Sequence, residues 1–473
     1  MNDAMENFTE KNARFFSRFD SPDVFDCLEF NVLKLVQHAV VRDRVFDVNA
    51  FIFLPPWLLK LILFFKRIRY SLRILSGRTN RIKPEDFQKL KNRKYLLIDS
   101  SKSIRKKDGT AVSFYFENLL HDLGRDHVVF CQGSLDDSEI HYDILFNKFY
   151  DEASILPLTE DDLELIRGLK QTYKNIKSTC RLTSNELNRL VGAIEIFWRQ
   201  YRAWRHVLKY LNPEMALLIS HYQREFIILA LKRKKIPVTE LQHGLIASED
   251  IFYVYPEQIS PIKDRALFAD RILVYGEYWK YILLQGKEYA LGQIGIIGDY
   301  LFHDKHLSEE FRQFAEQIVP QEGKVILITV QKNLEDIFIN YVRWLANDLT
   351  NKKMKDIILV KPHPNPKKDI SALNLLPNVY VTLFNLDWLF SITDIHVSIY
   401  STTLFDALKY SIKNNYSLAA RGCEDYVQSI VKSGVTVLLN LNENPVEKMN
   451  EKEIALDTRY FYADYKPKLI DIL

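Results

Sequence analysis

Short apolar runs alternate with amphipathic segments over most of the chain, a pattern that predicts strands and helices in turn. The runs typical of buried strands are 95–99, 127–131, 215–220, 238–242, 269–275 and 294–298, then 324–329, 356–360, 379–382, 394–398 and 415–419. Continuous apolar strands that alternate with helices form parallel sheets covered on both faces. We therefore predict an α/β protein with two Rossmann-like lobes and an interlobe cleft.

Three regions follow from the pattern. We predict a helical amino-terminal extension over 1–90, a first lobe with a helical insertion over 91–298, and a second lobe over 299–473. The length of 473 residues suits two domains or more. The hydrophobic fraction of 47% excludes a mostly disordered chain.

The first lobe contains two segments whose polarity differs from the alternating pattern. We expect a polar loop over 102–110 and an apolar helix over 112–123. The insertion is predicted to contain one helix that opens after Thr159 with an acidic first turn, and a second that runs from Ser184 to Leu211. The aromatic residues of the second helix are expected to belong to the core. In the second lobe we expect helices over 335–350 and 402–413.

One segment of the extension is both apolar and strongly basic. Between Lys60 and Lys107 there are 16 Lys and Arg but only 3 acidic residues. This local charge of +13 leaves −10 for the rest of the chain, although the net charge is only +3. Such an asymmetry indicates a particular partner surface.

The helix predicted from Pro56 to Leu75 has apolar residues at three- and four-residue spacing and cations between them. Three interpretations stay open: a helix that packs on the protein with a solvated basic face, a helix that lies in a membrane interface, and a surface for another acidic polymer. A span is excluded, because Pro55 and Pro56 interrupt the apolar run. The residues predicted to face a membrane or an acceptor are Trp57, Lys66, Arg67, Arg69 and Arg73.

The cellular location is predicted from two weaker signals. The first 16 residues lack the pattern of a secretory signal, and the four cysteines lie far apart without a CxxC pair. We expect a reducing, cytoplasmic location, with association at the inner face of the cytoplasmic membrane if the basic helix binds lipid.

Three short motifs follow predicted strands, at the sheet edge where open α/β sheets bind ligands. In the segment 241–245, His243 precedes Gly244 and could exchange a proton near neutral pH, or be a structural histidine. In 360–366, Lys361 and His363 stand among three prolines and suit a phosphate, or form a stiff solvated turn. In 398–406, three hydroxyl residues, Ser401, Thr402 and Thr403, begin a helix that binds an anion or is simply capped.

Together these motifs resemble the GT-B superfamily of surface and capsule polysaccharide glycosyltransferases. The sequences QHG, KPHP and SIYSTTLFD look like those of teichoic-acid glycerophosphotransferases, and bacterial sialyl- and Kdo-transferases share the His-Pro motif. The resemblance covers roughly residues 215–410, with Lys361 where the glycerophosphotransferase pattern has an arginine. It implies a nucleotide-sugar donor, a glycan or lipid-linked acceptor, and inversion at the transferred sugar carbon.

The resemblance also implies a role for each candidate residue. The donor phosphate is expected to contact Lys361, His363, Ser401, Thr402 and Thr403, and the ribose Asp406. His243 is the expected base, with Glu249 and Asp250 as further candidates.

No DxD motif, GxGxxG loop or GxxxxGK[ST] loop occurs in the chain, so we expect neither a metal nor another cofactor. The near-neutral net charge argues against a nucleic-acid partner. Two rival functions stay open: polyol-phosphate transfer on the same scaffold, and an inactive scaffold that binds glycan or membrane. A cytidine nucleotide is the weakly favoured donor, because the resembling families use CMP- or CDP-linked donors.

Overall fold

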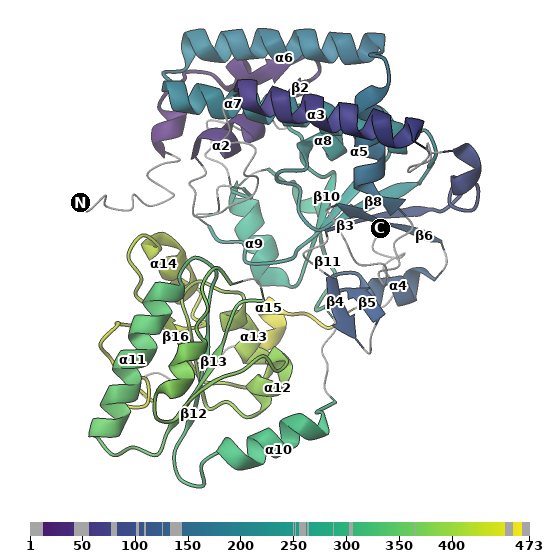
Figure 1. The fold of residues 1–473 in the computed structure, drawn as a ribbon. Helices are drawn as coiled ribbons and strands as arrows, with labels where there is room; N and C mark the ends of the chain where they lie inside the picture. Colours follow the sequence, from purple (N-terminus) through teal and green to yellow (C-terminus); the bar gives the residue numbers. More distant parts are fainter. Residues whose placement is uncertain are drawn as a thin grey trace. The chain divides into compact units, whose positions relative to one another are not determined.

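The computed structural model describes most of the chain. The described residues are 13–41, 56–76, 83–100, 104–107, 110–124, 126–132, 144–248, 250, 252–254, 262, 264–286, 288–301, 306–364, 366–449 and 457–465. They form two compact units, which Figure 1 shows in ribbon form. The amino-terminal unit contains the described residues of 13–243, 252–301 and 462–465, and the carboxyl-terminal unit those of 244–250 and 306–461.

The amino-terminal unit is built on a parallel sheet. Among the described residues the strand order is β11-β10-β9-β8-β3-β6-β7, and every neighbouring pair is parallel. The strands are β3 (Tyr95–Ser100), β6 (His127–Gln132), β7 (Ile144–Leu145), β8 (Met215–Leu218), β9 (Val238–Leu241), β10 (Arg271–Val274) and β11 (Ile294–Ile296). The apolar runs predicted to be strands in this part of the chain are thus strands.

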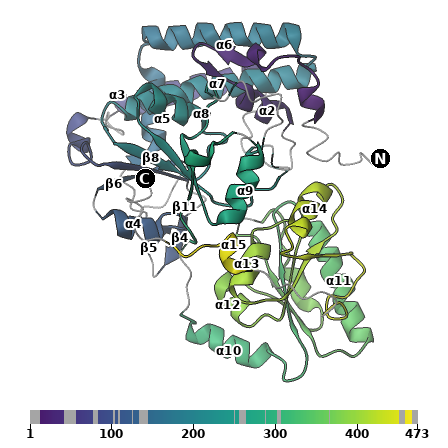
Figure 2. The ribbon, with the colours of Figure 1, turned by 180° about the vertical axis from the view of Figure 1, so that it is seen from behind.

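Helices pack around this sheet. They are α2 (Leu33–Val41), α3 (Pro56–Leu75), α4 (Glu117–Leu123), α5 (Phe146–Ile155), α6 (Glu160–Thr179), α7 (Ser184–Val207), α8 (Glu225–Arg233) and α9 (Glu277–Gly286). Helix α7 contacts α2, α3, α5, α6 and α8, so it is the centre of the helical layer. Figures 1 and 2 show α3, α6 and α7 gathered at one end of the unit. As predicted, α7 carries core aromatics: Phe197, Tyr201 and Trp204 are buried.

The first described residues, 13–41, belong to this helical layer. The short strands β1 (Asp26–Cys27) and β2 (Phe30–Asn31) pair antiparallel, which corrects the expectation that the extension is helical throughout. Phe25 and Phe30 are buried, and β1 contacts α6. Residues 13–41 therefore contribute core side chains to the amino-terminal unit.

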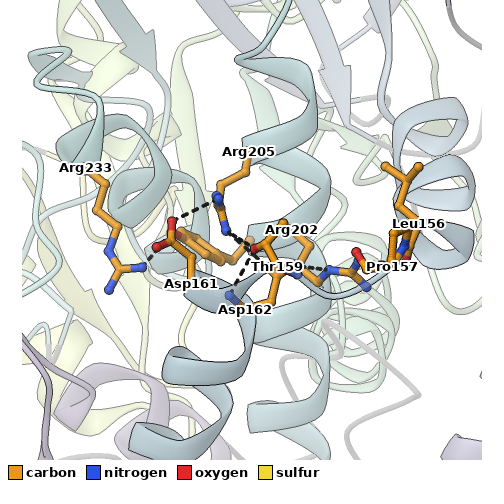
Figure 3. A network of polar contacts seen from close by, with 9 residues as sticks. Leu156, Pro157, Thr159, Asp161, Asp162, Arg202, Arg205 and Arg233 are labelled. Carbon is orange, nitrogen blue, oxygen red and sulfur yellow. Dashed lines mark hydrogen bonds and ion pairs between the residues drawn. The ribbon is translucent and has the colours of Figure 1, made fainter.

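Buried ion pairs join α6 to α7 (Figure 3). Thr159 caps α6 with its hydroxyl, and Asp162 accepts a hydrogen bond from the Thr159 backbone N–H at 2.9 Å, a reciprocal capping box. The same carboxylate accepts from Arg202 and Arg205 of α7, each at 3.2 Å. The predicted acidic first turn is thus confirmed.

A β-hairpin replaces the loop and part of the helix predicted over 102–123. Strands β4 (Ile104–Lys107) and β5 (Thr110–Ser113) pair antiparallel, and α4 begins only at Glu117. Asp108 and Gly109, between Lys107 and Thr110, are a residue pair favoured in two-residue hairpin loops. That local signal was overlooked in favour of the apolar pattern.

The carboxyl-terminal unit has a second parallel sheet. In the described residues its order is β14-β13-β12-β15-β16-β17, with parallel pairs throughout. The strands are β12 (Val325–Thr329), β13 (Ile357–Lys361), β14 (Val379–Val381), β15 (Ile395–Ser398), β16 (Asn414–Leu418) and β17 (Val437–Leu439). All five side chains of β12 are buried, as expected for a central strand covered on both faces.

The helices of this unit are α10 (Glu309–Ile318), α11 (Glu335–Asn351), α12 (Leu386–Ser391), α13 (Thr403–Lys409), α14 (Glu424–Lys432) and α15 (Thr458–Phe461). Helix α13 is shorter than the predicted 402–413. It ends at Lys409, and Ser411 has a φ of +58°, a left-handed conformation that stops an α-helix. The predicted α/β class with two parallel-sheet lobes is confirmed, while the interlobe cleft and the boundaries at residues 90 and 298 stay predictions.

The end of the described chain returns to the amino-terminal unit. The backbone N–H of Ala463 donates to the Tyr275 carbonyl, and that of Asp299 donates to the Ala463 carbonyl, both at 2.9 Å. Gly298 has a φ of +84°, and a Cβ there would lie 2.4 Å from the Asp464 carbonyl oxygen. Only glycine allows this approach, which explains the glycine that ends the predicted strand 294–298.

Candidate functional site

The order in which the chain adds strands to the carboxyl-terminal sheet reverses between β12 and β15. The chain proceeds from β12 to β13 and β14 on one side and then places β15 on the other side of β12. Such a topological switch point leaves a crevice at the carboxyl ends of the two strands, where open α/β sheets bind ligands. The hydroxyl motif follows β15 and therefore lies at this switch point.

A chain of hydrogen bonds lies at the switch point. His396 Nδ1 lies 2.8 Å from Asn415 Oδ1, and the Asn415 amide donates to the carbonyls of Leu404 and Val435. The Asn415 oxygen therefore faces His396 and accepts the Nδ1–H, which leaves Nε2 to accept from Thr329 at 3.0 Å.

This chain determines the orientation of one predicted donor residue. Because the Thr329 hydroxyl donates to His396, its oxygen accepts from Thr403 Oγ1 at 2.9 Å. Burial lowers the pKa of His396 to about 4, which keeps the imidazole neutral and the pattern fixed. The Thr403 hydroxyl thus joins the start of α13 to the end of β12.

Lys361 lies at the same edge of the sheet. It ends β13 and is the register partner of Thr329. Its ammonium donates to the carbonyl oxygens of Leu383 and Phe384, at 2.7 and 2.6 Å, so two of its three N–H groups hold the loop after β14. His363 follows two residues later and is half-buried. The structure therefore brings the KPHP motif next to β12, one of the two strands at the switch point.

The remaining donor candidates surround the start of α13. Ser401 Oγ accepts from the Thr403 backbone N–H at 3.2 Å, which is a local capping contact. Thr402 precedes the helix and is half-buried. Asp406 forms an ion pair with Lys409, with 3.1 Å between the Asp406 Oδ1 and Lys409 Nζ atoms. Ser401 thus makes a local contact of the capping type, while its phosphate role and the ribose role of Asp406 stay predictions.

The loop after β12 contributes residues that the sequence analysis did not select. Gln331 Oε1 accepts from the backbone N–H groups of Ile399 and Tyr400, at 3.3 and 2.9 Å, and so joins this loop to the loop after β15. Lys332 follows and is half-buried. The sequence could have indicated residues 330–332 as part of the site, because they follow a buried strand, as the three predicted motifs do.

A second switch point lies in the amino-terminal sheet, between β3 and β8. From β3 the chain adds β6 and β7 on one side, then β8, β9, β10 and β11 on the other. His243 follows β9, the next strand along. Its Nε2 lies 3.1 Å from the Tyr222 hydroxyl, and the Tyr115 ring meets the imidazole edge-on at 6.1 Å between centroids.

Electrostatics keep His243 neutral. Burial lowers its pKa to about 4, and the nearby Arg224 acts in the same direction, while Glu240 opposes both. A neutral imidazole can accept a proton, so this geometry is compatible with the predicted base. His243 is a weak base at this pKa, because its conjugate acid loses the proton readily.

A buried polar network next to His243 was not predicted. His221 Nδ1 lies 2.5 Å from Glu240 Oε2, and Lys34 Nζ lies 2.5 Å from His221 Nε2. Tyr253 donates to Glu240 Oε1 at 2.6 Å, and Lys34 also donates to the Phe252 carbonyl at 2.5 Å. Burial acts to raise the pKa of Glu240, but its contacts with His221 and Tyr253 hold that pKa below its usual value. The network therefore anchors α2 of the extension to the sheet beneath His243.

Glu249 and Asp250 were the other candidate bases. Glu249 lies outside the described residues. Asp250 is buried, and its backbone N–H donates to the Ala247 carbonyl at 3.0 Å, within the carboxyl-terminal unit. A different carboxyl group, Glu225 at the start of α8, is buried in the amino-terminal unit, and burial raises its pKa to about 7. Glu225 is therefore a further candidate for proton transfer.

Two more predictions concern a metal and the membrane. Within the described ranges no three His, Cys, Asp or Glu residues gather as potential metal ligands, and the expected metal independence stays a prediction. Trp57, Lys66, Arg67, Arg69 and Arg73 all lie exposed on α3.

No protein-family model matches the chain, and no curated protein matches it. Among solved structures, UDP-GlcNAc 2-epimerase from Methanocaldococcus jannaschii in complex with UDP-GlcNAc and UDP is 14% identical, with 80% of this chain and 99% of that chain covered and a TM-score of 0.46. The glycosyltransferase SnogD from Streptomyces nogalater is 12% identical, with 78% and 92% covered and a TM-score of 0.43. Matches at this level of similarity do not assign an activity to the chain.

Proposed function

We propose that this protein is a glycosyltransferase of the GT-B type that transfers a sugar, with inversion, from a nucleotide-sugar to a hydroxyl of a lipid-linked or growing surface polysaccharide. The supporting observation is that each of its two sheets places polar side chains at its own switch point. One unit then binds the nucleotide and the other binds the acceptor. We favour a cytidine nucleotide, because the families with similar motifs use CMP- or CDP-linked donors.

The nucleotide binds at the crevice between β12 and β15. The donor phosphate requires positive charge and N–H or O–H donors, because negative charge develops on it as the sugar leaves. His363, Ser401 and Thr402 supply donors at this edge. Lys361 contributes mainly its charge, since most of its N–H groups hold the loop after β14. Lys332, in the loop after β12, is the second cation of the proposed site.

The acceptor binds next to His243. Its hydroxyl replaces Tyr222 as the partner of Nε2, the acceptor oxygen forms a bond to the sugar carbon, and the hydroxyl proton passes to the neutral imidazole. The bond between that carbon and the phosphate oxygen breaks, and the nucleotide leaves as the phosphate-containing product. One bond forms, one breaks and one proton is transferred, so no further reactant is required. Glu249, Asp250 and Glu225 are the alternative proton acceptors.

The first test is a thermal-shift screen of the whole chain with CMP, CDP, UDP and GDP. We expect the cytidine nucleotides to raise the melting temperature most, by binding the folded state. His363→Ala should abolish this shift and lower turnover at least about 100-fold, the scale of losing one group that stabilises charge in the transition state. His306→Ala, which changes an exposed histidine before α10, is the matched control and should keep both properties.

Product analysis then separates the rival functions. A glycosyltransferase adds the mass of a sugar to the acceptor, whereas a polyol-phosphate transferase adds a polyol phosphate. If none of the four nucleotides shifts the melting temperature, the binding-scaffold alternative gains support. If His363→Ala retains full turnover, the proposed phosphate site is wrong.

A further inference from the structure

Helix α3 exposes an apolar stripe to solvent. Its members are Trp57, Leu61, Phe64, Phe65, Ile68, Leu72 and Leu75, with exposed fractions from 39% to 82%. Successive members are mostly three or four residues apart, so they follow one face of the helix over its whole length. Exposing large apolar side chains singly is ordinary, but a continuous stripe of seven indicates an interaction surface.

The opposite face of α3 holds the helix on the protein. Tyr70 is 4% exposed, and α3 contacts α5 and α7. With about 100° of rotation per residue, Tyr70 points roughly 160° away from Ile68, in the middle of the stripe. The stripe is therefore not the side by which the helix joins the core.

Cations border the stripe on both sides. By the same rotation per residue, Arg67 and Arg69 each lie about 100° from Ile68, on opposite sides of the stripe. Arg73 and Lys66 lie about 140° and 160° from Ile68, further round toward the face of Tyr70. All four are exposed. One nearby carboxyl group, Asp151 of α5, faces this region: burial raises its pKa, and Lys66, Arg73 and Arg69 oppose that rise. The surface around the stripe thus stays strongly positive.

We propose that α3 docks the protein on an anionic lipid bilayer, lying in the plane of the interface with its apolar stripe in the acyl boundary. This inference is independent of the proposed sugar transfer. A bilayer offers an apolar layer bordered by negative headgroups, which matches a stripe bordered by cations. A second copy of the helix would oppose like charges along both borders. Among the described helices none is long and apolar enough to span a membrane.

Vesicle sedimentation tests the electrostatic part. The full chain should sediment with vesicles of phosphatidylcholine and phosphatidylglycerol and much less with phosphatidylcholine alone. Each Arg near an anionic surface contributes about a five-fold change in partitioning. Arg67→Gln, Arg69→Gln and Arg73→Gln combined should therefore weaken binding about 100-fold. The matched control is Lys170→Gln, Lys174→Gln and Lys177→Gln on α6, which removes three exposed cations from a helix without such a stripe.

A second variant tests the apolar part. Phe64→Gln, Phe65→Gln and Leu72→Gln remove side chains that are 56–58% exposed, and glutamine is a good helix former. We expect at least a 10-fold loss of vesicle binding, with an unchanged circular dichroism spectrum and an unchanged nucleotide-induced thermal shift.

Three outcomes would overturn the proposal. The first is a wild-type protein that does not sediment with anionic vesicles. The second is an α6 control that loses as much binding as the α3 arginine variant, since overall charge would then explain the effect. The third is a wild-type dimer in light scattering that the apolar variant converts to a monomer without loss of vesicle binding, since the stripe would then join two copies of the chain.

Discussion

His396 is a buried histidine whose neutral form is built into the carboxyl-terminal sheet. The imidazole donates to Asn415 and accepts from Thr329, so protonation of Nε2 would remove an acceptor and leave two donors facing each other. Burial lowers its pKa from 6.5 to about 4, although the hydrogen bond with Asn415 acts in the opposite direction. This residue therefore links the stability of the candidate nucleotide site to pH.

Through His396, acid destabilises the folded state. The unfolded state binds a proton on His396 below about pH 6.5, but the folded state does so only below about pH 4, so acid favours unfolding in that window. Between pH 7 and pH 5 the loss from this residue is about 2 kcal/mol. We expect His396→Gln to reduce the fall in the free energy of unfolding between these pH values by that amount, as measured by urea denaturation. Equal slopes for the variant and the wild type would contradict the assigned neutral state.

At the scale of elements, the pairing of α6 with α7 depends on one carboxylate. Asp162 closes the capping box of α6 and binds Arg202 and Arg205, and its side chain is 4% exposed. Removing one member of a buried ion pair leaves uncompensated charge. Asp162→Ala should therefore lower the free energy of unfolding by about 3 kcal/mol.

Chemical denaturation with circular dichroism detection measures this loss. Glu164→Gln on the same helix is the control, because that side chain is exposed and its change should stay within about 0.5 kcal/mol. A loss for Asp162→Ala no larger than that of the control would show that solvent already screens the pairs.

The elements that the sequence predicted are those with a strong local signal. Strand β12 is a run of five apolar residues, and α6 begins with a Thr and an Asp three residues later, so each could be located without knowledge of its neighbours. The hairpin of β4 and β5 was missed although Asp108 and Gly109 carry a local turn signal. Its flanking residues do not alternate in the way that predicts strands.

The candidate sites were predictable only in part, because their geometry depends on strand order. The motifs that contain His243, Lys361 and Ser401 were recognised at strand ends, but the pairing of Lys361 with Thr329 follows from the order of the sheet. Lys34 and His221 are 187 positions apart, and no pattern in the sequence connects them. Contacts of this kind are long-range and become visible only in the folded chain.

At the scale of the molecule, each unit contains its own sheet and its own buried core. The carboxyl-terminal core consists of the side chains of its six strands and of helices such as α11, for example Phe338 and Leu345. The amino-terminal core includes Trp204 and Trp279. A ligand that binds one unit alone stabilises that unit against local opening and leaves the other unchanged, unless the two are coupled.

Hydrogen exchange with mass-spectrometric detection can therefore assign the nucleotide to a unit. With CDP at 100 times its dissociation constant, the bound unit gains about 2.7 kcal/mol. We expect slower exchange in the loop after β12, at residues 330–334, and around the start of α13, at residues 399–404, because both border the switch point. Exchange in α6 and α7 should stay unchanged and serves as the internal control. Protection confined to residues 220–225 and His243 would reverse the assignment, because the nucleotide would then occupy the amino-terminal switch point and the carboxyl-terminal unit would be left for the acceptor.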